Sequence, residues 1–213
     1  MRFLVITDFH QKISMLDLIN SRIDEYKPEF TLFLGDVTDM GTGEDAVGII
    51  SSINSDVYAI PGNCDPRDFP QKISEAAHDM HGKGVDIRGQ YFAGLGGSNI
   101  TIFGTPFELT EDELYKGLKP ISRKDMVLMT HVPSYGVLDM IPSGLNVGSK
   151  SVRRIVDEYK PVLALSGHVH EAIGAIELNG TLFVNPGPAR QGRCAIIDLE
   201  NGHASAELIG PMD

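Results

Sequence analysis

Residues that can bind metal ions follow a short apolar run at five places in this chain. The first run, residues 2–7, ends before Asp8 and His10, and each later run is followed by an aspartate, an asparagine or a histidine. The residues that follow the five runs are Asp8, His10, Asp36, Asn63, His131, His168 and His170. One such residue after an apolar run could arise by chance. Its repetition after five runs predicts a metal-dependent hydrolase.

The number and type of these side chains predict two ions. Two carboxylates, one amide oxygen and four imidazoles are more than one tetrahedral zinc site uses. The pairs Asp8-x-His10 and His168-x-His170 each place two ligands on one side of an extended segment, because strand side chains alternate. No thiolate is needed. The mixed nitrogen and oxygen set therefore favours Mn, Fe or Zn over a soft-metal site. We expect Mn, with Fe, Zn or Ni as alternatives.

Buried parallel strands would bring these residues together. Short apolar runs bounded by Gly or Pro are typical of buried strands, and the carboxyl ends of such strands face a common crevice. Apolar residues at helical spacing predict a helix over residues 11–27, ended by Pro28, and another over 44–53. The segment Asp-Glu-Tyr-Lys-Pro occurs at 24–28 and again at 157–161. It is either a coincidence of helix ends or a sign of two similar units facing one site.

The rest of the chain predicts mixed sheets. Asn179-Gly180 and Asn201-Gly202 are each flanked by strand-forming residues, which is typical of two-residue hairpins. The glycine-rich segment 94–97 lacks a phosphate-loop pattern and is better explained by tight turns. With helix-connected strands in the first half, we expect an α/β fold. No linker-like tract interrupts the chain, so residues 1–213 are expected to form a single domain.

Composition narrows the range of partners. The chain has 213 residues, of which 42% are hydrophobic and 22% charged, and its net charge is −11. This acidic balance disfavours nucleic acid as a partner without excluding it, and it disfavours an anionic membrane. No apolar run approaches the roughly 20 residues of a membrane span, and no signal peptide is evident. Cys64 and Cys194 form no CxxC pair, so we expect reduced thiols in a cytoplasmic protein.

The ordered motifs DxH, GDxxD, GN(H/C)D, a lone His and GHxH span residues 8 to 170. This set resembles the calcineurin-like metallophosphoesterases. Segments 94–97, 104–107 and 180–187 are similar to the small prokaryotic branch of predicted phosphoesterases related to Icc. The resemblance implies a four-layer αββα sandwich, in which helices flank two mixed β-sheets.

The resemblance also implies how the ligands are divided. One ion would be held by Asp8, His10, Asp36 and His170, and the other by Asp36, Asn63, His131 and His168. A metal-bridging hydroxide would then hydrolyse a small phosphoester substrate, with phosphodiesters favoured. Alternatives are a phosphomonoesterase, a nuclease, or a catalytically silent metal-binding scaffold. A homo-oligomer is compatible with the sequence.

One position departs from the common family pattern. Many members have histidine after the asparagine, where it assists the leaving group, whereas this chain has Cys64. A thiol beside cations tends to lose its proton, so the general acid is undefined. Asp65, together with Asp39, is expected to orient the site. The expected catalytic residues are Asp36, Asn63, Cys64, Asp65 and His131. Arg67 is expected to be a surface charge, with substrate phosphate as its alternative contact.

Overall fold

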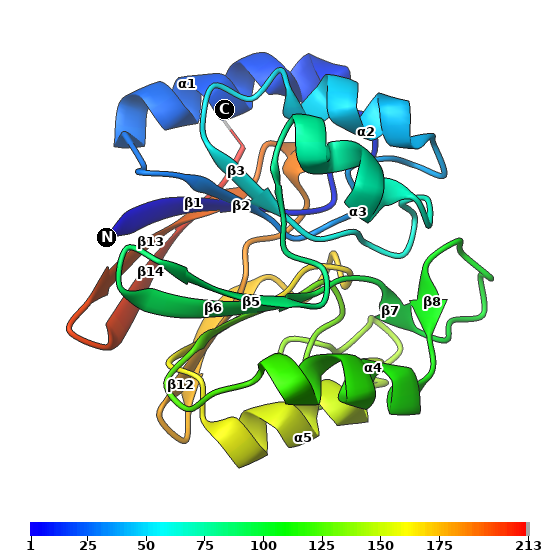
Figure 1. The fold of residues 1–213 in the computed structure, drawn as a ribbon, viewed down its shortest axis with the longest axis vertical. Helices are drawn as coiled ribbons and strands as arrows, with labels where there is room; N and C mark the ends of the chain where they lie inside the picture. Colours follow the sequence, from blue (N-terminus) through cyan, green and yellow to red (C-terminus); the bar gives the residue numbers. More distant parts are fainter. Residues whose placement is uncertain (212–213) are drawn as a thin grey trace.

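Two six-stranded sheets lie face to face in the computed structural model, which describes residues 1–211 (Figure 1). The first sheet contains, in order across it, β14 (His203–Ile209), β13 (Cys194–Glu200), β1 (Arg2–Ile6), β2 (Thr31–Phe33), β3 (Val57–Ala59) and β4 (His78–Asp79). The second contains β11 (Gly174–Leu178), β12 (Thr181–Asn185), β10 (Leu163–Leu165), β9 (Val127–Thr130), β6 (Gln90–Leu95) and β5 (Lys83–Ile87). Each sheet combines parallel central strands with antiparallel neighbours, so both are mixed as predicted.

Helices cover the outer faces of both sheets. The first sheet is covered by α1 (Leu16–Tyr26), α2 (Gly43–Ile50) and α3 (Phe69–Lys72), and the second by α4 (Glu111–Leu118) and α5 (Lys150–Tyr159) (Figure 1). Short 3-10 turns occur at η1 (Ile13–Met15), η2 (Ile73–Glu75), η3 (Lys119–Ile121) and η4 (Ala189–Gln191). The predicted four-layer αββα sandwich of two mixed β-sheets flanked by helices is therefore confirmed.

Strand β1 shows why the apolar runs of this sequence are continuous. Phe3 and Val5 pack between the two sheets, whereas Leu4 and Ile6 pack in the core on the helix side of the first sheet. All four side chains are fully buried. Because alternate residues of a strand face opposite sides, a strand covered on both faces needs apolar residues at every position.

The two copies of the repeated segment have the same local form. Helix α1 ends at Tyr26 and α5 ends at Tyr159, and the lysine that follows each has a φ of 48°. This left-handed residue closes the helix, and proline comes next, so the chain turns toward a strand. Strands β2 and β10 follow, one in each sheet. The repeat therefore marks two equivalent helix-to-strand connections.

Both predicted hairpins are present. Asn179-Gly180 joins β11 to β12, and Asn201-Gly202 joins β13 to β14, each as a two-residue loop. All four loop residues have a positive φ, between 51° and 82°. Asparagine and glycine tolerate this conformation best, and it matches the twist of the flanking strands.

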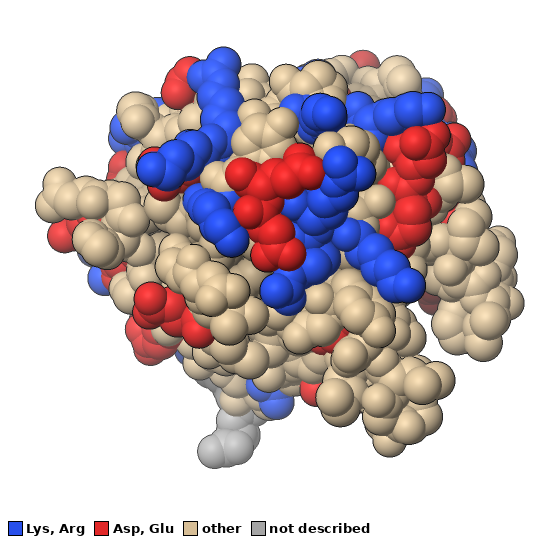
Figure 2. Space-filling model, turned by 90° about the horizontal axis from the view of Figure 1, so that it is seen from below, with Lys and Arg blue, Asp and Glu red and all other residues tan. Residues whose placement is uncertain are grey.

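The face covered by α4 and α5 has mixed charge. Basic and acidic side chains are interleaved on it (Figure 2). Ion pairs within the helices join Lys116 to Asp112 at 2.6 Å and Arg154 to Glu158 at 2.6 Å. The face is therefore not a continuous basic surface. Within residues 1–211, no helix has the length and apolarity that a membrane crossing requires.

Candidate metal centre

The seven predicted ligands follow five parallel strands, three in the first sheet and two in the second, and the structure brings them to one place. Contacts of 4.0 Å or less link the two sheets here. His131, after β9, lies 3.4 Å from the Asp36 carboxylate through its Nε2 atom. His170, after β10, lies 3.1 Å from the Asp8 carboxylate through Nε2. Asn63 joins the group because its Oδ1 atom is 3.1 Å from Nε2 of His131.

The backbone turns sharply where it leaves the strands. Asp8, His10, Asp36 and His168 all have a positive φ, between 47° and 65°. This region is sparsely populated for residues other than glycine, and such residues cluster at functional sites. The turns direct these side chains to the carboxyl edge of the sheets instead of continuing the strand alternation.

Two glycines of the sequence motifs allow the backbone to approach the carboxylates. A Cβ atom added to Gly62 would lie 2.0 Å from Oδ1 of Asp36. One added to Gly167 would lie 2.6 Å from Oδ2 of Asp8. Both contacts are far inside van der Waals distance, so any side chain at these positions would displace a carboxylate.

Each carboxylate is buried and held by a backbone amide. Asp8 is 1% exposed and Asp36 is 2% exposed. The amide of Cys64 donates to Oδ1 of Asp36 at 2.8 Å, and the amide of His168 donates to Oδ2 of Asp8 at 3.1 Å. The remaining oxygen of each carboxylate faces imidazoles. The pair is therefore arranged to present oxygen atoms to a shared interior space.

The surroundings of His10 indicate whether a cation fits between the predicted ligands. Its side chain is 8% exposed, yet neither ring nitrogen has a hydrogen-bond partner among the described residues. Nε2 lies 3.6 Å from Asp36 and 3.9 Å from Asp8, while Nδ1 lies 3.7 Å from the exposed Asp39 carboxylate. Buried polar atoms are nearly always satisfied, and two buried carboxylates repel each other. A cation coordinated by His10 and the carboxylates would remove both penalties, so the residues fit a metal.

The geometry defines overlapping ligand groups. Ligand atoms of Asp8, His10 and His170 lie within 4.8 Å of one another, and so do those of Asp8, Asp36 and His131. Both groups combine carboxylate oxygen with imidazole nitrogen, as a divalent transition metal prefers. His168 belongs to none of these groups among the described residues, although its ring centroid is 5.1 Å from that of His131.

Burial and neighbouring charges shift the pKa values of two of these histidines in opposite directions. Burial lowers the pKa of His131, but the Asp36 and Asp8 carboxylates outweigh it and raise the pKa to about 9. The pKa of His168 is lowered to about 4 by burial and by the charge of His131. The site thus balances its carboxylates with one positive imidazole. Metal binding would release the proton of this imidazole.

Comparison with known proteins identifies the family. A model for calcineurin-like phosphoesterases matches residues 1–172. The chain belongs to this family. An uncharacterized protein of Methanocaldococcus jannaschii, MJ1162, is 30% identical over 199 residues, which cover 88% of both chains. A relative from Arcobacter nitrofigilis, named a probable glycerophosphodiester phosphodiesterase, is 27% identical over 167 residues, 68% of this chain and 57% of that protein.

Solved structures share the fold. Protein TT1561 of Thermus thermophilus superposes with a TM-score of 0.73 at 16% identity, over 97% of both chains. A dimetal phosphatase from Danio rerio superposes with a TM-score of 0.64 at 12% identity, over 98% of this chain and 96% of that one. The family and the clustered Asp and His residues support a divalent metal site in a hydrolase.

Asp65 contacts the backbone around the phosphoesterase centre instead of facing it. The carboxylate is fully buried and accepts hydrogen bonds from the amides of Gly62 and Thr38, both at 2.8 Å, and from the Thr38 hydroxyl at 2.9 Å. Burial, followed by the nearby Asp36 charge, raises the pKa of Asp65 to about 7. These bonds tie the loop after β3 to the loop after β2. Asp65 thus holds these two loops together, and its role in catalysis stays a prediction.

Cys64 lies inside the cluster of predicted metal ligands. Its thiol belongs to a third group with His10 and Asp36, with ligand atoms within 4.8 Å of one another. Burial and the neighbouring Asp36 carboxylate raise the pKa of the Cys64 thiol above its usual value. Cys64 therefore lies beside two predicted ligands, at the sequence position where many family members have histidine.

Sequence reasoning missed Arg190. Its guanidinium donates a hydrogen bond to Nδ1 of His170 at 3.0 Å, and its backbone amide donates to the carbonyl of Asp8 at 3.2 Å. The signal in the sequence was the turn at Asn185, whose side-chain amide donates to the carbonyl of Val169 at 2.9 Å. That bond ties the turn to the last histidine motif and brings Arg190 to the centre.

Arg67, in contrast, contacts a loop. Its guanidinium donates to the carbonyls of Pro106 at 2.8 Å and Glu108 at 2.7 Å, and it lies 4.6 Å from the centroid of the Phe107 ring. The side chain is exposed, as expected for a surface charge, but it also fixes the segment 106–108.

Proposed function

We propose that this chain is a metal-dependent phosphodiesterase. The observation that carries the proposal is the buried pair Asp8 and Asp36 beside His10, whose ring nitrogens have no partner among the described residues. Such an arrangement is costly without a cation and favourable with one. The family to which the chain belongs supplies the reaction class, hydrolysis of phosphoric esters.

The residues divide into two sets that share Asp36. Asp8, His10 and His170 would complete one site with it, and the remaining predicted ligands, Asn63, His131 and His168, would complete the other. When bound, two divalent ions supply Lewis acidity and lower the pKa of a water toward about 7. The metal is proposed to be Mn, with Fe, Zn or Ni as alternatives.

The protein's own groups orient these ligands. Nδ1 of His131 donates to the carbonyl of Leu34 at 2.8 Å, which fixes the ring with Nε2 toward Asp36. Such outer hydrogen bonds set the tautomer and direction of a ligating histidine. Arg190 places a guanidinium beside His170, where it can bind a non-bridging phosphoryl oxygen.

A diester is the proposed substrate because of the name of a relative, since the charge of the centre depends on the bound ions. A phosphodiester has one negative charge, whereas a phosphomonoester near pH 7 has about 1.5 to 2. Two divalent ions would more than offset the charge of the buried Asp8 and Asp36 carboxylates, so charge does not separate the two kinds of ester. The name of the Arcobacter nitrofigilis relative, a probable glycerophosphodiester phosphodiesterase, supports the diester.

Metal-dependent hydrolysis of a matched ester pair tests the proposal. Purified protein loaded with Mn, Ni, Zn or Mg should cleave bis(4-nitrophenyl) phosphate with a kcat/KM at least about tenfold above that for 4-nitrophenyl phosphate. Chelation should abolish both reactions, and so should His170→Ala. His78→Ala, in an exposed histidine paired with Asp56, is the matched control and should retain activity. A monoester preference would overturn the diester assignment, and inactivity with every metal would overturn the enzymatic one.

A further inference from the structure

A cavity of about 680 Å³ adjoins the candidate metal centre. His168 and His170 form part of its lining, and most of the remainder comes from residues 99–103 and 141–147. Small-molecule sites have volumes of roughly 300 to 1,000 Å³ and are mostly apolar. A molecule bound in this cavity would therefore contact the side chains predicted to hold the metal.

The cavity wall is apolar and strongly exposed. Ile102 is 95% exposed, Phe103 76%, and Ile100 63%, all on the loop after β7 (Ser98–Asn99). Leu145, from the facing loop, is 63% exposed. Apart from the two histidines, Glu171 is the ionisable side chain in the lining. Contiguous exposed apolar residues of this kind mark binding sites.

The first loop is held in place from its base. Strand β7 pairs with β8 (Glu108–Leu109), and the Glu108 carboxylate accepts hydrogen bonds from the amide and hydroxyl of Thr105 at 3.0 and 2.8 Å. The hydroxyl of Thr105 in turn accepts from Nδ2 of Asn63 at 3.0 Å. The apolar residues are thus fixed relative to a predicted metal ligand.

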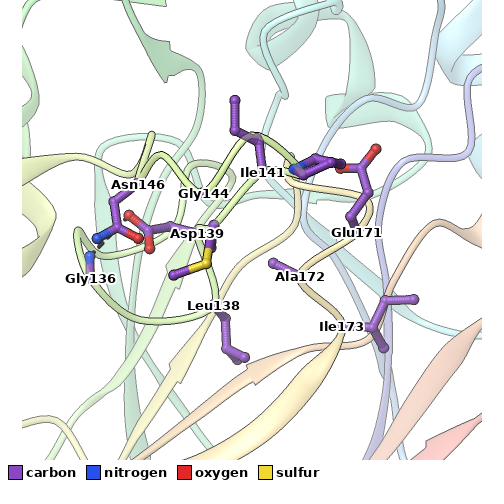
Figure 3. Close-up of a pocket in the computed structure, with 11 residues that line it drawn as sticks. Gly136, Leu138, Asp139, Ile141, Gly144, Asn146, Glu171, Ala172 and Ile173 are labelled. Atoms are coloured by element: carbon purple, nitrogen blue, oxygen red, sulfur yellow. Dashed lines mark hydrogen bonds between the residues drawn. The ribbon is translucent and has the colours of Figure 1, made fainter.

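The second loop is fixed by a buried carboxylate. Asp139 is 1% exposed and accepts hydrogen bonds from the amides of Gly136 at 2.9 Å and Gly148 at 3.0 Å. A neighbouring pocket of about 520 Å³ shares Ile141, Pro142 and Glu171 with the cavity. Figure 3 shows Ile141 and Glu171 close together at one end of this pocket and Asp139 toward the other. Residues of the loop between Gly136 and Gly148 therefore line both hollows, and the hydrogen bonds to Asp139 join the two ends of the loop.

The two walls are also joined to each other. Nδ2 of Asn99 donates to the carbonyl of Val147 at 3.2 Å. Preformed apolar walls that meet beside a charged centre suit a ligand with an anionic head and an apolar body, because burial of apolar surface favours binding at little ordering cost.

We propose that this cavity binds an alkyl or acyl chain of the substrate while the substrate's phosphate lies at the metal centre. The inference rests on the proposed phosphodiesterase function and adds the substrate class, an amphiphilic phosphodiester. Membrane surfaces and a second copy of the chain are the other occupants that exposed apolar residues could serve. The lining by His168 and His170 favours a substrate group, because it places the occupant next to the reacting phosphate.

Two diesters that differ only in the retained group test this. Methyl 4-nitrophenyl phosphate and hexyl 4-nitrophenyl phosphate release the same phenolate, so their kcat/KM ratio reports binding of the chain. We expect the hexyl ester to be preferred by at least about tenfold, since one methylene in an apolar pocket can give about that factor. The double variant Ile102→Ser with Phe103→Ser should reduce the ratio to below about threefold. Ile176→Ser, at a residue 46% exposed on β11 and outside both pockets, should leave the ratio unchanged.

A binding measurement separates this inference from the proposed function. Calorimetry with hexylphosphonate and methylphosphonate should show at least about tenfold tighter binding of the hexyl ligand, which is lost in the double variant. If neither ester is cleaved but this preference holds, the catalytic proposal fails and the apolar site stands. If both esters are cleaved with equal kcat/KM, the catalytic proposal stands and the apolar site is wrong.

Two further results would also overturn the substrate site. One is sedimentation of the protein with phosphatidylcholine vesicles, lost in the double variant, without any hexyl preference. The other is a dimer in solution that becomes monomeric in the same variant, again without that preference. Each would assign the apolar residues to an interface.

Discussion

The two sheets contribute different chemistry to the same centre. The first sheet supplies both carboxylates, from Asp8 and Asp36, and each is almost fully buried and held by a backbone amide. The second sheet supplies imidazoles, of which His168 and His170 are half-buried and line the apolar cavity. The negative charge that attracts cations is therefore buried. The two ligands that line the cavity are imidazoles, which are neutral when unprotonated.

The two helix-to-strand connections show how similar local structure serves both halves. Each ends in a glycine followed by a ligand with a positive φ, Asp36 at 50° and His168 at 65°. The difference is the side chain placed there. An aspartate at the end of β2 can be shared between ions, whereas a histidine at the end of β10 adds one nitrogen. Asp36 and His168 thus occupy equivalent positions in the fold, and the type of residue decides how each can bind a metal.

The strongest test of this comparison removes the shared charge. Asp36→Asn keeps the size of the side chain but not its negative charge, so metal content should fall at both sites and kcat on bis(4-nitrophenyl) phosphate should fall more than about 100-fold. Elemental analysis and steady-state kinetics measure these effects. The exposed carboxylate of Asp56 provides the control, because Asp56→Asn should change neither quantity. Retention of one tightly bound ion by the Asp36 variant would show that this residue does not bridge.

A second test compares two imidazoles of the second sheet. His131→Ala and His168→Ala should both lose activity, but only the first should be strongly destabilised. His131 is fully buried, and its removal leaves the Leu34 carbonyl without its donor, which costs about 1–3 kcal/mol. The His168 variant should lose less than about 1 kcal/mol. Urea unfolding of the metal-free proteins measures both, and equal losses would mean that burial does not distinguish these ligands.

Cys64 gives a smaller effect that separates the metals from the leaving-group acid. With cysteine in place of histidine and no strong acid to protonate the leaving group, rates should favour aryl leaving groups of low pKa and fall steeply for alkyl ones. Cys64→Ala should lose less than about threefold on bis(4-nitrophenyl) phosphate, because positioned acids matter most for poor leaving groups. Cys64→His, if it packs, should gain on those substrates by up to about 100-fold.

A plot of log rate against leaving-group pKa measures the change in slope. Cys194→Ala, a buried free cysteine on β13, is the matched control and should keep the wild-type slope. Collapse of activity on every substrate in Cys64→Ala would instead identify Cys64 as the proton donor or a ligand.

The smallest expected effect concerns the two helix ends. Lys27 and Lys160 both have a φ of 48°, a conformation that costs a non-glycine residue about 1–2 kcal/mol. Glycine at either position should raise the free energy of unfolding by about 0.5 kcal/mol after its greater unfolded entropy is subtracted. Because the helices lie on opposite outer faces, the two gains should add. Lys119→Gly, at a right-handed position with a φ of −52°, should lower stability when measured by the same urea titration.

Local pattern was enough to predict mixed sheets and the residues at the strand ends, whereas the four layers were predicted from the family resemblance. Buried strands such as β1 are continuous apolar runs in the sequence, and each run ends shortly before a predicted ligand. The order of runs and ligands along the chain therefore indicates that the ligands share one edge of the sheets. The Arg190 contact with His170 could not be read in this way, because it depends on a hydrogen bond from Asn185 to the loop after β10. Nor could the exposed apolar loop at 100–103, since its place beside the centre depends on pairing between β7 and β8. Long-range contacts place both features beside the centre.

The hydrogen bond from His131 to Leu34 crosses from one sheet to the other, and it makes the spacing of the sheets part of the chemistry. That spacing is set by large rings in the layer between them. Phe3 stacks on Phe30 with centroids 5.1 Å apart, and Phe92 meets both rings edge-on. The aromatic layer thus fixes the distance between the two halves of the metal centre. A change of ring size in this layer would shift the ligands of one sheet relative to those of the other. Metal preference can therefore change without the replacement of any ligand.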